Sequence, residues 1–198
     1  MMNRIRGSIN EYRQRRRWRS LRKMGMHLGK GVNLPLSTWI DVSHCFLIFI
    51  GDNCGFGEQC AILAHDAMPN EYIDATRIGW VKIHESCHFG MRTIIAPGVE
   101  IGPRSIVLAN SVVAYDIPPE TVASGYPARV ICTLDEYRTR HLDAMKKSPN
   151  FPYSKYSVQY LNEKKIRHVR KKLDGTIGYI TGGYTAMIEK GECLYRTN

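Results

Sequence analysis

The 198-residue sequence has no long apolar run, since its longest, CFLIFI at 45–50, spans six residues. A signal peptide needs an apolar stretch of about 7–15 residues and a membrane-spanning helix needs about 20, so we expect neither. Acidic residues are also few, with 18 Asp and Glu against 28 Lys and Arg, which gives a formal charge of +10. We expect a cytoplasmic protein with one compact domain and terminal additions.

The sequence also lacks paired cysteines and nucleic-acid motifs. None of the six cysteines forms a CxxC pair, so neither a disulfide framework nor a zinc ribbon is indicated. We expect Cys54, Cys60 and Cys87 to be reduced core residues. The positive charge suits any phosphate-bearing ligand, but no zinc-finger, RNP or helix-turn-helix pattern accompanies it, which argues against a nucleic-acid partner.

What the sequence does have is a six-residue repeat from Ile83 to Ile117. Cut at its apolar position, it reads IHESCH, FGMRTI, IAPGVE, IGPRSI, VLANSV and VAYDI. This period is typical of a solenoid in which each block forms a short strand and a turn, and three blocks close one triangular coil. The apolar residue should point inward and stack on its equivalent 18 residues along, and Gly90, Gly98 and Gly102 should provide corners with positive φ. Sandwich strands would alternate with period two instead.

A weaker form of the same register occupies residues 28–63, and two interruptions break it. The first lies near 46–49, where we expect a bulge or an irregular corner. The second separates Ile62 from Ile83 by 21 residues. Its extra residues lie in a polar stretch, and residues 66–77 should therefore leave the coil as a loop.

Helices are expected on both sides of the repeat. Ser8 and Glu11 have the spacing of a capping box, and a basic helix within residues 1–26 should run from there to Gly25. This helix either docks on the coil with its charges in solvent or rests on an anionic membrane or an acidic polymer. In the extension at 132–198, two helices and a terminal β-hairpin around Gly182-Gly183 are expected, the helices at residues 134–145 and 156–173.

Three further segments resemble known proteins: CAILAHDA at 60–67, the stretch at 76–102, and SVVAYDIPPETVASGYPARVI at 111–131. Together with the hexapeptides they resemble the left-handed β-helix acyltransferases, more narrowly the maltose/galactoside-type and polysaccharide O-acetyltransferases. The last segment is similar to the terminal coil of that family. The resemblance implies an all-β solenoid, a left-handed parallel β-helix at residues 27–131.

Members of that family transfer an acetyl group from acetyl-CoA to a hydroxyl and act as homotrimers, with each active site between two neighbouring coils. The resemblance implies that His65 is the general base, which removes the hydroxyl proton and returns it to the CoA thiolate. For the adjacent Asp66, three roles stay open: orienting His65, contacting another subunit, or capping the loop. His88 matches a position near the bound substrates.

The resemblance also places acetyl-CoA along a groove between coils, where small residues permit close approach and basic residues meet the phosphates. The matching positions are Gly90, Met91, Ala109, Ala114, Tyr115 and Arg129. The short loop at 66–77 favours a saccharide acceptor that is a polysaccharide or its precursor.

Other functions stay open. The γ-class carbonic anhydrases share the coil and bind zinc with three histidines, but His84 and His88 have the wrong spacing for that site, and we expect no metal. A serine or antibiotic O-acetyltransferase is the main enzymatic alternative. A non-catalytic trimeric scaffold is the other, and Leu108 supports it because a small residue is usual there.

Overall fold

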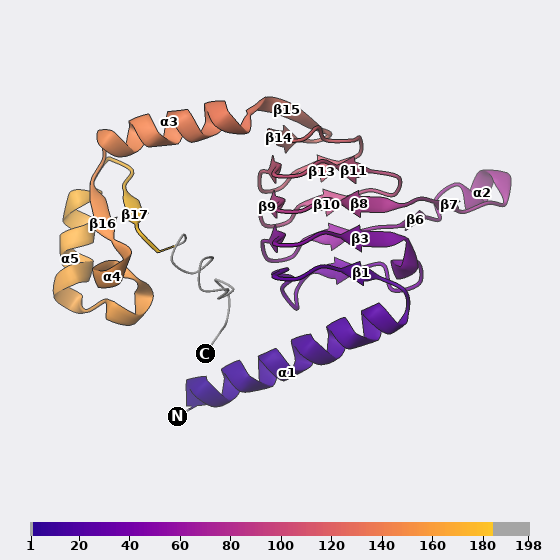
Figure 1. The fold of residues 1–198 in the computed structure, drawn as a ribbon, viewed down its shortest axis with the longest axis horizontal. Helices are drawn as coiled ribbons and strands as arrows, with labels where there is room; N and C mark the ends of the chain where they lie inside the picture. Colours follow the sequence, from indigo (N-terminus) through magenta and orange to yellow (C-terminus); the bar gives the residue numbers. More distant parts are fainter. Residues whose placement is uncertain (1, 184–198) are drawn as a thin grey trace. The chain divides into compact units, whose positions relative to one another are not determined.

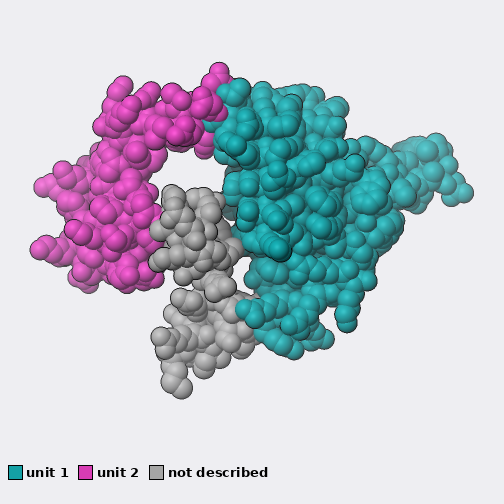
Figure 2. Space-filling model, in the orientation of Figure 1, with its two compact units in different colours: residues 1–134, 197–198 teal, residues 135–196 magenta. Residues whose placement is uncertain are grey.

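The structure is a computed structural model that describes residues 2–183 (Figure 1). The chain divides into two compact units, the first ending at Leu134 and the second starting at Asp135 (Figure 2).

The first unit consists of short strands in three sheets. The first sheet contains β1 (His27–Leu28), β3 (Ile48–Ile50), β8 (Val81–Ile83) and β11 (Glu100–Ile101). The second sheet contains β4 (Gly55–Phe56), β9 (His88–Phe89), β12 (Ile106–Val107), β14 (Thr121–Gly125) and β15 (Ala128–Thr133). The third sheet contains β2 (Trp39–Ile40), β5 (Ala61–Ile62), β10 (Ile94–Ile95) and β13 (Val112–Val113).

The chain visits these sheets in rotation, and each turn from β3 to β13 contributes one strand to each sheet (Figure 1). Neighbouring strands pair in parallel, except β14 and β15, which form an antiparallel hairpin. The expected three-sided coil of parallel strands is therefore present. It places residues of equivalent phase in successive turns next to one another.

Apolar side chains fill the coil in columns. Ile83 pairs with Ile101 and Ile95 with Val113, each 18 residues apart as expected, and all four are fully buried. Most polar side chains in the interior have a partner: the hydroxyl of Ser111, for example, donates to the carbonyl of Leu108 at 2.7 Å, and the buried Thr38 hydroxyl is an exception. The three cysteines expected in the core are buried and free, as the repeat predicts.

The corners depart from expectation in one respect. Gly98 has a positive φ of 85°, but Gly90 and Gly102 do not. They are glycines because the next turn of the coil lies against them: a Cβ on Gly90 would lie 2.3 Å from the backbone nitrogen of Ala109. The left-handed corner positions are held mostly by other residues, among them Asn53, Gln59, Ser86, Arg92, Arg104 and Asn110.

Helix α1 (Met2–Lys23) covers the N-terminal end of the coil (Figure 1). Leu21 is 3% exposed and belongs to the core. The Gln14 side chain donates to the carbonyl of Leu34 at 2.7 Å, and Arg17 donates to the carbonyl of Thr38 at 2.5 Å. The helix is thus docked on the coil. Its contact with a membrane or anionic polymer stays a prediction, to which the exposed Arg13, Arg15, Arg16, Arg19 and Lys23 contribute.

The start of this helix differs from the prediction. It begins at Met2, whereas the capping-box spacing placed the start at Ser8. A Ser and a Glu three residues apart also fit inside a helix, where they face the same side, so the pattern alone does not fix a boundary. The helix ends at Lys23, before Gly25, whose φ is 96°.

The second unit is mainly helical. Its elements are α3 (Leu134–Lys146), β16 (Asn150–Pro152), α4 (Tyr153–Tyr156), η2 (Val158–Tyr160), α5 (Glu163–Lys172) and β17 (Tyr179–Thr181). The helix expected at 156–173 is interrupted, because Asn162 caps α5 by accepting a hydrogen bond from the backbone of Lys165. Strand β17 pairs in parallel with β16, and the expected hairpin partner falls outside the described residues.

Within residues 2–183, no helix combines the length and the apolar character that crossing a membrane requires.

A matched pair of substitutions tests the inward column. Ile83 is fully buried, whereas Ile73 on helix α2 (Asn70–Ile73) is 68% exposed. Ile83→Ala should lower the free energy of unfolding by about 2–5 kcal/mol because it leaves a cavity. Ile73→Ala should change it by less than about 0.5 kcal/mol. Denaturant unfolding measures both, and equal losses would contradict the assignment of Ile83 to the core.

Candidate active site

Both interruptions of the repeat leave the coil at the same corner, between the third sheet and the first. The earlier one follows β2 and contains the 3₁₀ helix η1 (Cys45–Leu47). The later one follows β5 and forms an arm of β6 (His65–Asp66), α2 and β7 (Arg77–Ile78), in which β6 and β7 pair antiparallel (Figure 1). Because β2 and β5 are neighbours in the third sheet, the residues that follow them lie side by side.

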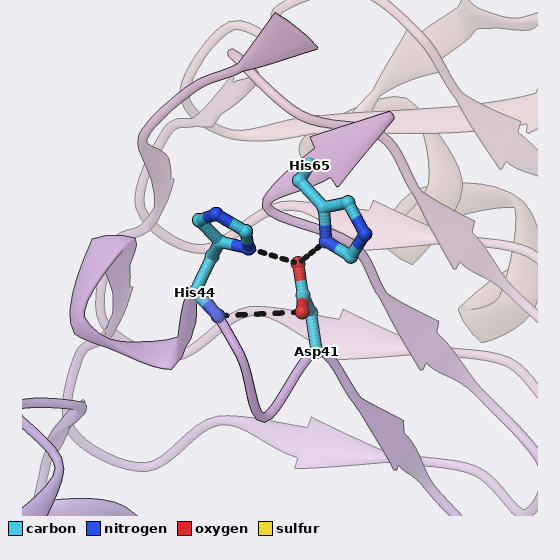
Figure 3. A group of neighbouring side chains, drawn as sticks. All are labelled: Asp41, His44 and His65. Carbon is cyan, nitrogen blue, oxygen red and sulfur yellow. Dashed lines mark hydrogen bonds and ion pairs between the residues drawn. The ribbon is translucent and has the colours of Figure 1, made fainter. Parts of the chain in front are cut away.

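This arrangement brings Asp41 to His65. The His65 Nδ1 lies 2.5 Å from the Asp41 Oδ2. Figure 3 draws this contact as a dashed line. The Asp41 side chain is 1% exposed, whereas that of His65 is 29% exposed. The carboxylate is therefore buried behind an imidazole whose outer edge reaches solvent.

Other donors hold the Asp41 carboxylate independently of His65. The backbone N–H of Ala64 donates to Oδ2 at 3.1 Å. The Ser43 hydroxyl donates to Oδ1 at 2.7 Å, and the His44 backbone N–H donates to the same oxygen at 3.3 Å. With these contacts fixing its carboxylate, Asp41 presents Oδ2 to the imidazole in a set orientation.

The same contacts keep Asp41 charged. Burial alone would raise the pKa of Asp41, but the hydrogen bonds from His65, Ser43 and Ala64 outweigh it and lower the pKa below its ordinary value of 3.8. An ionised Asp41 accepts a hydrogen bond from the protonated Nδ1 of His65. The second ring nitrogen, Nε2, is then the unprotonated atom in the neutral imidazole, free to accept a proton from another molecule.

A second histidine adjoins the pair. Figure 3 shows His44 beside Asp41 and His65. The His44 ring centroid lies 4.6 Å from that of His65, and the His44 Nδ1 is 3.8 Å from the Asp41 Oδ2 and 3.0 Å from the Ser43 hydroxyl. Among the described residues, Asp41, His44 and His65 are the only three His, Cys or acidic side chains close enough together to hold a metal ion.

Asp66 has a different contact. Its Oδ1 accepts the backbone N–H of Met68 at 3.0 Å, which caps the turn at the base of the arm. Of the open alternatives, this contact corresponds to the loop cap, and the carboxylate that touches His65 is Asp41.

The residues expected to bind acetyl-CoA lie at two different corners. Gly90, Met91 and Ala109 occupy the corner that precedes the third sheet, where the Asn110 N–H donates to the Met91 carbonyl at 2.9 Å. Ala114 follows β13 and thus lies at the corner after the third sheet, the one from which His65 leaves. One face of the coil separates the two groups.

The structure brings two of these expected residues together. The Arg129 guanidinium lies 4.3 Å from the centroid of the Tyr115 ring, a cation–π contact at the corner after β13. Both side chains are exposed, so the pair forms an accessible cationic surface.

His84 and His88, the histidines considered for a carbonic anhydrase site, have separate surroundings. His88 is half-buried on β9 and lies over Gly55, and burial lowers its pKa. The Nε2 of His84 is instead 2.7 Å from Glu100. Neither belongs to the group formed by Asp41, His44 and His65.

The family described as bacterial transferase hexapeptide (six repeats) matches residues 81–114. Over these residues the chain is similar to the hexapeptide-repeat transferases. The match covers β8 to β13, the most regular part of the coil, and therefore agrees with the topology of the sheets.

This chain is also similar to individual proteins. It is 35% identical over 115 residues to YvoF of Bacillus subtilis (strain 168), which is an acetyltransferase by name, and 41% identical over 61 residues to a galactoside O-acetyltransferase of Escherichia coli (strain K12). These matches span 58% and 31% of this chain, and 64% and 30% of the relatives.

The fold of this chain is also similar to that of a galactoside acetyltransferase solved in complex with coenzyme A. The TM-score is 0.50 and the sequence identity 22%, over 70% of this chain and 84% of the other. This likeness concerns the fold.

The sequence predicted a role for His65 but not for Asp41 and His44, which the structure places beside it. A signal was present: Ile40 and Ile62 hold the same place in the repeat, and an interruption follows each of them. Two interruptions at one phase of a coil must emerge at one corner, where their side chains are able to meet.

The lowered pKa of Asp41 predicts a pH-dependent contribution to stability. Because the folded pKa is depressed, this contribution is present above the ordinary pKa of 3.8 and is lost as the pH falls through the lower folded value. The destabilisation caused by Asp41→Asn should therefore be largest near neutral pH and shrink in acid. Denaturant unfolding from about pH 7 to pH 3 measures it.

The matched control is Asp74→Asn, because Asp74 is an exposed carboxylate on the arm and Asn tolerates its positive φ of 50°. It should change the free energy of unfolding little. An Asp41→Asn effect of the same size at every pH would argue against an ionised, hydrogen-bonded Asp41.

Proposed function

We propose that this protein is a hexapeptide-repeat transferase that moves an acetyl group from acetyl-CoA to a hydroxyl of a saccharide, with His65 as general base. The observation that carries the proposal is the His65–Asp41 pair, in which a buried carboxylate orients an imidazole whose Nε2 has no hydrogen-bond partner among residues 2–183. The acetyltransferase names of the relatives support the reaction class. We also infer that the coil is left-handed, as in the acyltransferases that the sequence resembles.

The reaction needs a base because a saccharide hydroxyl is too weak an acid to attack a thioester at neutral pH. His65 Nε2 accepts the hydroxyl proton while the oxygen forms a bond to the thioester carbon. Collapse of the tetrahedral intermediate breaks the carbon–sulfur bond, and the imidazolium returns the proton to the departing thiolate. The Asp41 carboxylate stabilises the imidazolium between these steps.

The proposed acetyl-CoA site needs the corners on both sides of the third sheet, and assembly of several chains would bring such corners together. The outward positions of the third sheet are apolar and paired in one row: Trp39, Ala61, Ile94 and Val112. Trp39 is 53% exposed and Ile94 38%. An apolar row of this kind favours contact with another protein surface. We propose that a homotrimer buries it.

Such a trimer completes the groove. Because Gly90 and Ala109 lie at one edge of the third sheet and His65 at the other, burying this face brings one edge of a subunit toward the opposite edge of its neighbour. Acetyl-CoA would lie between them along the small residues, with Arg129 near its phosphates. His88 lies on β9 of the second sheet, so it would contact the substrates only from the side of the groove that Gly90 forms, opposite His65.

We propose a polysaccharide or its precursor as the acceptor and the cytoplasm as the location. The arm that begins at His65 leaves a side of the imidazole in solvent, which suits a bulky acceptor. Acetyl-CoA and buried reduced cysteines both fit a reducing compartment.

Substitutions in the pair test the mechanism. His65→Ala should lower kcat/KM about 10²–10⁴-fold because the base is lost. Asp41→Asn should lower it about tenfold or more because Asn stabilises the imidazolium less and permits the wrong tautomer. Asp66→Asn, which alters only the turn of the arm, serves as the control and should have little effect. Release of CoA thiol measures all three, and wild-type turnover by His65→Ala would refute the proposal.

The acceptor is tested in the same assay with oligosaccharides, monosaccharides, serine and a hydroxyl-bearing antibiotic. Oligosaccharides should react fastest. Faster turnover of serine or the antibiotic would favour those alternatives, and no binding of CoA at all would favour the non-catalytic scaffold.

The trimer has its own test. Trp39→Ser combined with Ile94→Ser should shift the mass in solution from three chains toward one, because the apolar row loses its largest side chains. Val158→Ser, at a position 88% exposed in the second unit, is the control and should leave the mass unchanged. Sedimentation equilibrium measures it. A wild-type protein that sediments as one chain would contradict the assembly.

A further inference from the structure

The group formed by Asp41, His44 and His65 has a feature that proton transfer by His65 does not use. Both imidazoles direct their Nδ1 atoms toward the same carboxylate oxygen, Asp41 Oδ2, at 2.5 and 3.8 Å (Figure 3). One atom from each residue lies within 4.8 Å of the other two. A single-proton relay needs only one of these histidines.

We infer that these three side chains form a binding site for a divalent transition ion such as Zn²⁺, and that the bound ion inhibits the transferase. The inhibition rests on the proposed function, whereas ion binding does not. The ion is thus an inhibitor of the site and not a cofactor of the proposed reaction.

The donor set fits this class of ion. Two imidazole nitrogens and one carboxylate oxygen suit Zn²⁺, while Ca²⁺ and Mg²⁺ prefer oxygen ligands throughout. With bonds of about 2.0–2.1 Å, tetrahedral ligands lie about 3.3 Å apart. The observed separations of 2.5 and 3.8 Å lie on either side of that value. A small rotation of the two rings would equalise them.

The surroundings favour binding as well. Ala64, Ser43 and the His44 backbone already hold the carboxylate, so it needs no reorientation. The two imidazoles are 29% and 27% exposed, which lets an ion enter and leaves a fourth position for water. One contact opposes binding, because the His44 Nδ1 must leave the Ser43 hydroxyl at 3.0 Å.

Binding of the ion would prevent His65 from acting as a base. An ion on His65 Nδ1 takes the place of the proton directed at Asp41, and the neutral ring then carries its proton on Nε2. No proton is gained or lost in this change of tautomer. Nε2 becomes an N–H donor and no longer accepts the proton of the attacking hydroxyl.

Ion binding is tested with Co²⁺ and Zn²⁺ on the full chain after treatment with a chelator. Co²⁺ should give the intense visible absorption of a four-coordinate site, and Zn²⁺ should displace it at one ion per chain. His44→Ala should weaken Zn²⁺ binding at least about tenfold, and His44→Cys, which supplies another zinc ligand, should restore it. His84→Ala is the matched control, because His84 pairs with Glu100 elsewhere.

The results separate this inference from the proposed function. Ion binding by the wild type that His44→Ala leaves unchanged, or no binding at all, would overturn the inference even if the protein transfers acetyl groups. If acetyl transfer is found, Zn²⁺ should inhibit it, a chelator should restore it, and His44→Ala should need at least about tenfold more Zn²⁺ for the same fractional inhibition. Binding without any transferase activity would leave the ion site standing and refute the proposed function alone.

Discussion

Parallel pairing between successive turns of the coil is the constraint on which the rest of this structure depends. Each strand is only a few residues long, and its backbone groups are satisfied by the strands of the turns on either side. Inward side chains such as Ile83 and Ile101 therefore stack in register. The same register aligns the corners. A residue that leaves one corner consequently meets whatever leaves that corner in the next turn, however far apart the two are in sequence.

Asp41 and His65 illustrate this consequence. They are 24 positions apart, yet each follows a strand of the third sheet, and those strands are neighbours. Burying a carboxylate is unfavourable unless donors surround it. Here three protein donors and the imidazole do so, and the pKa of Asp41 is lowered as a result. The coil thus converts a periodic backbone into a site where a charged group is buried and an adjoining ring is exposed.

The faces of the coil differ in chemistry. The third sheet presents an apolar row that includes Trp39 and Ile94, whereas the outward positions of the first sheet include Lys82 and Glu100, which form an ion pair. At the N-terminal end, α1 covers the core with Leu21 and directs several arginines outward. These differences follow from which side chain occupies the outward position of each block, since the inward positions are uniformly small or apolar.

The hexapeptide period by itself determined the coil, its inward columns and the buried cysteines, because a six-residue repeat leaves few ways to bury one apolar residue per block. It also located the arm between Ile62 and Ile83. The sequence pattern did not fix the start of α1, the break before α5 or the reason for Gly90, since local patterns are compatible with several boundaries and close approaches are made by distant residues. The partner of His65 was decided only by tertiary structure, because adjacency along the chain suggested Asp66 while pairing between turns brought Asp41 to the imidazole.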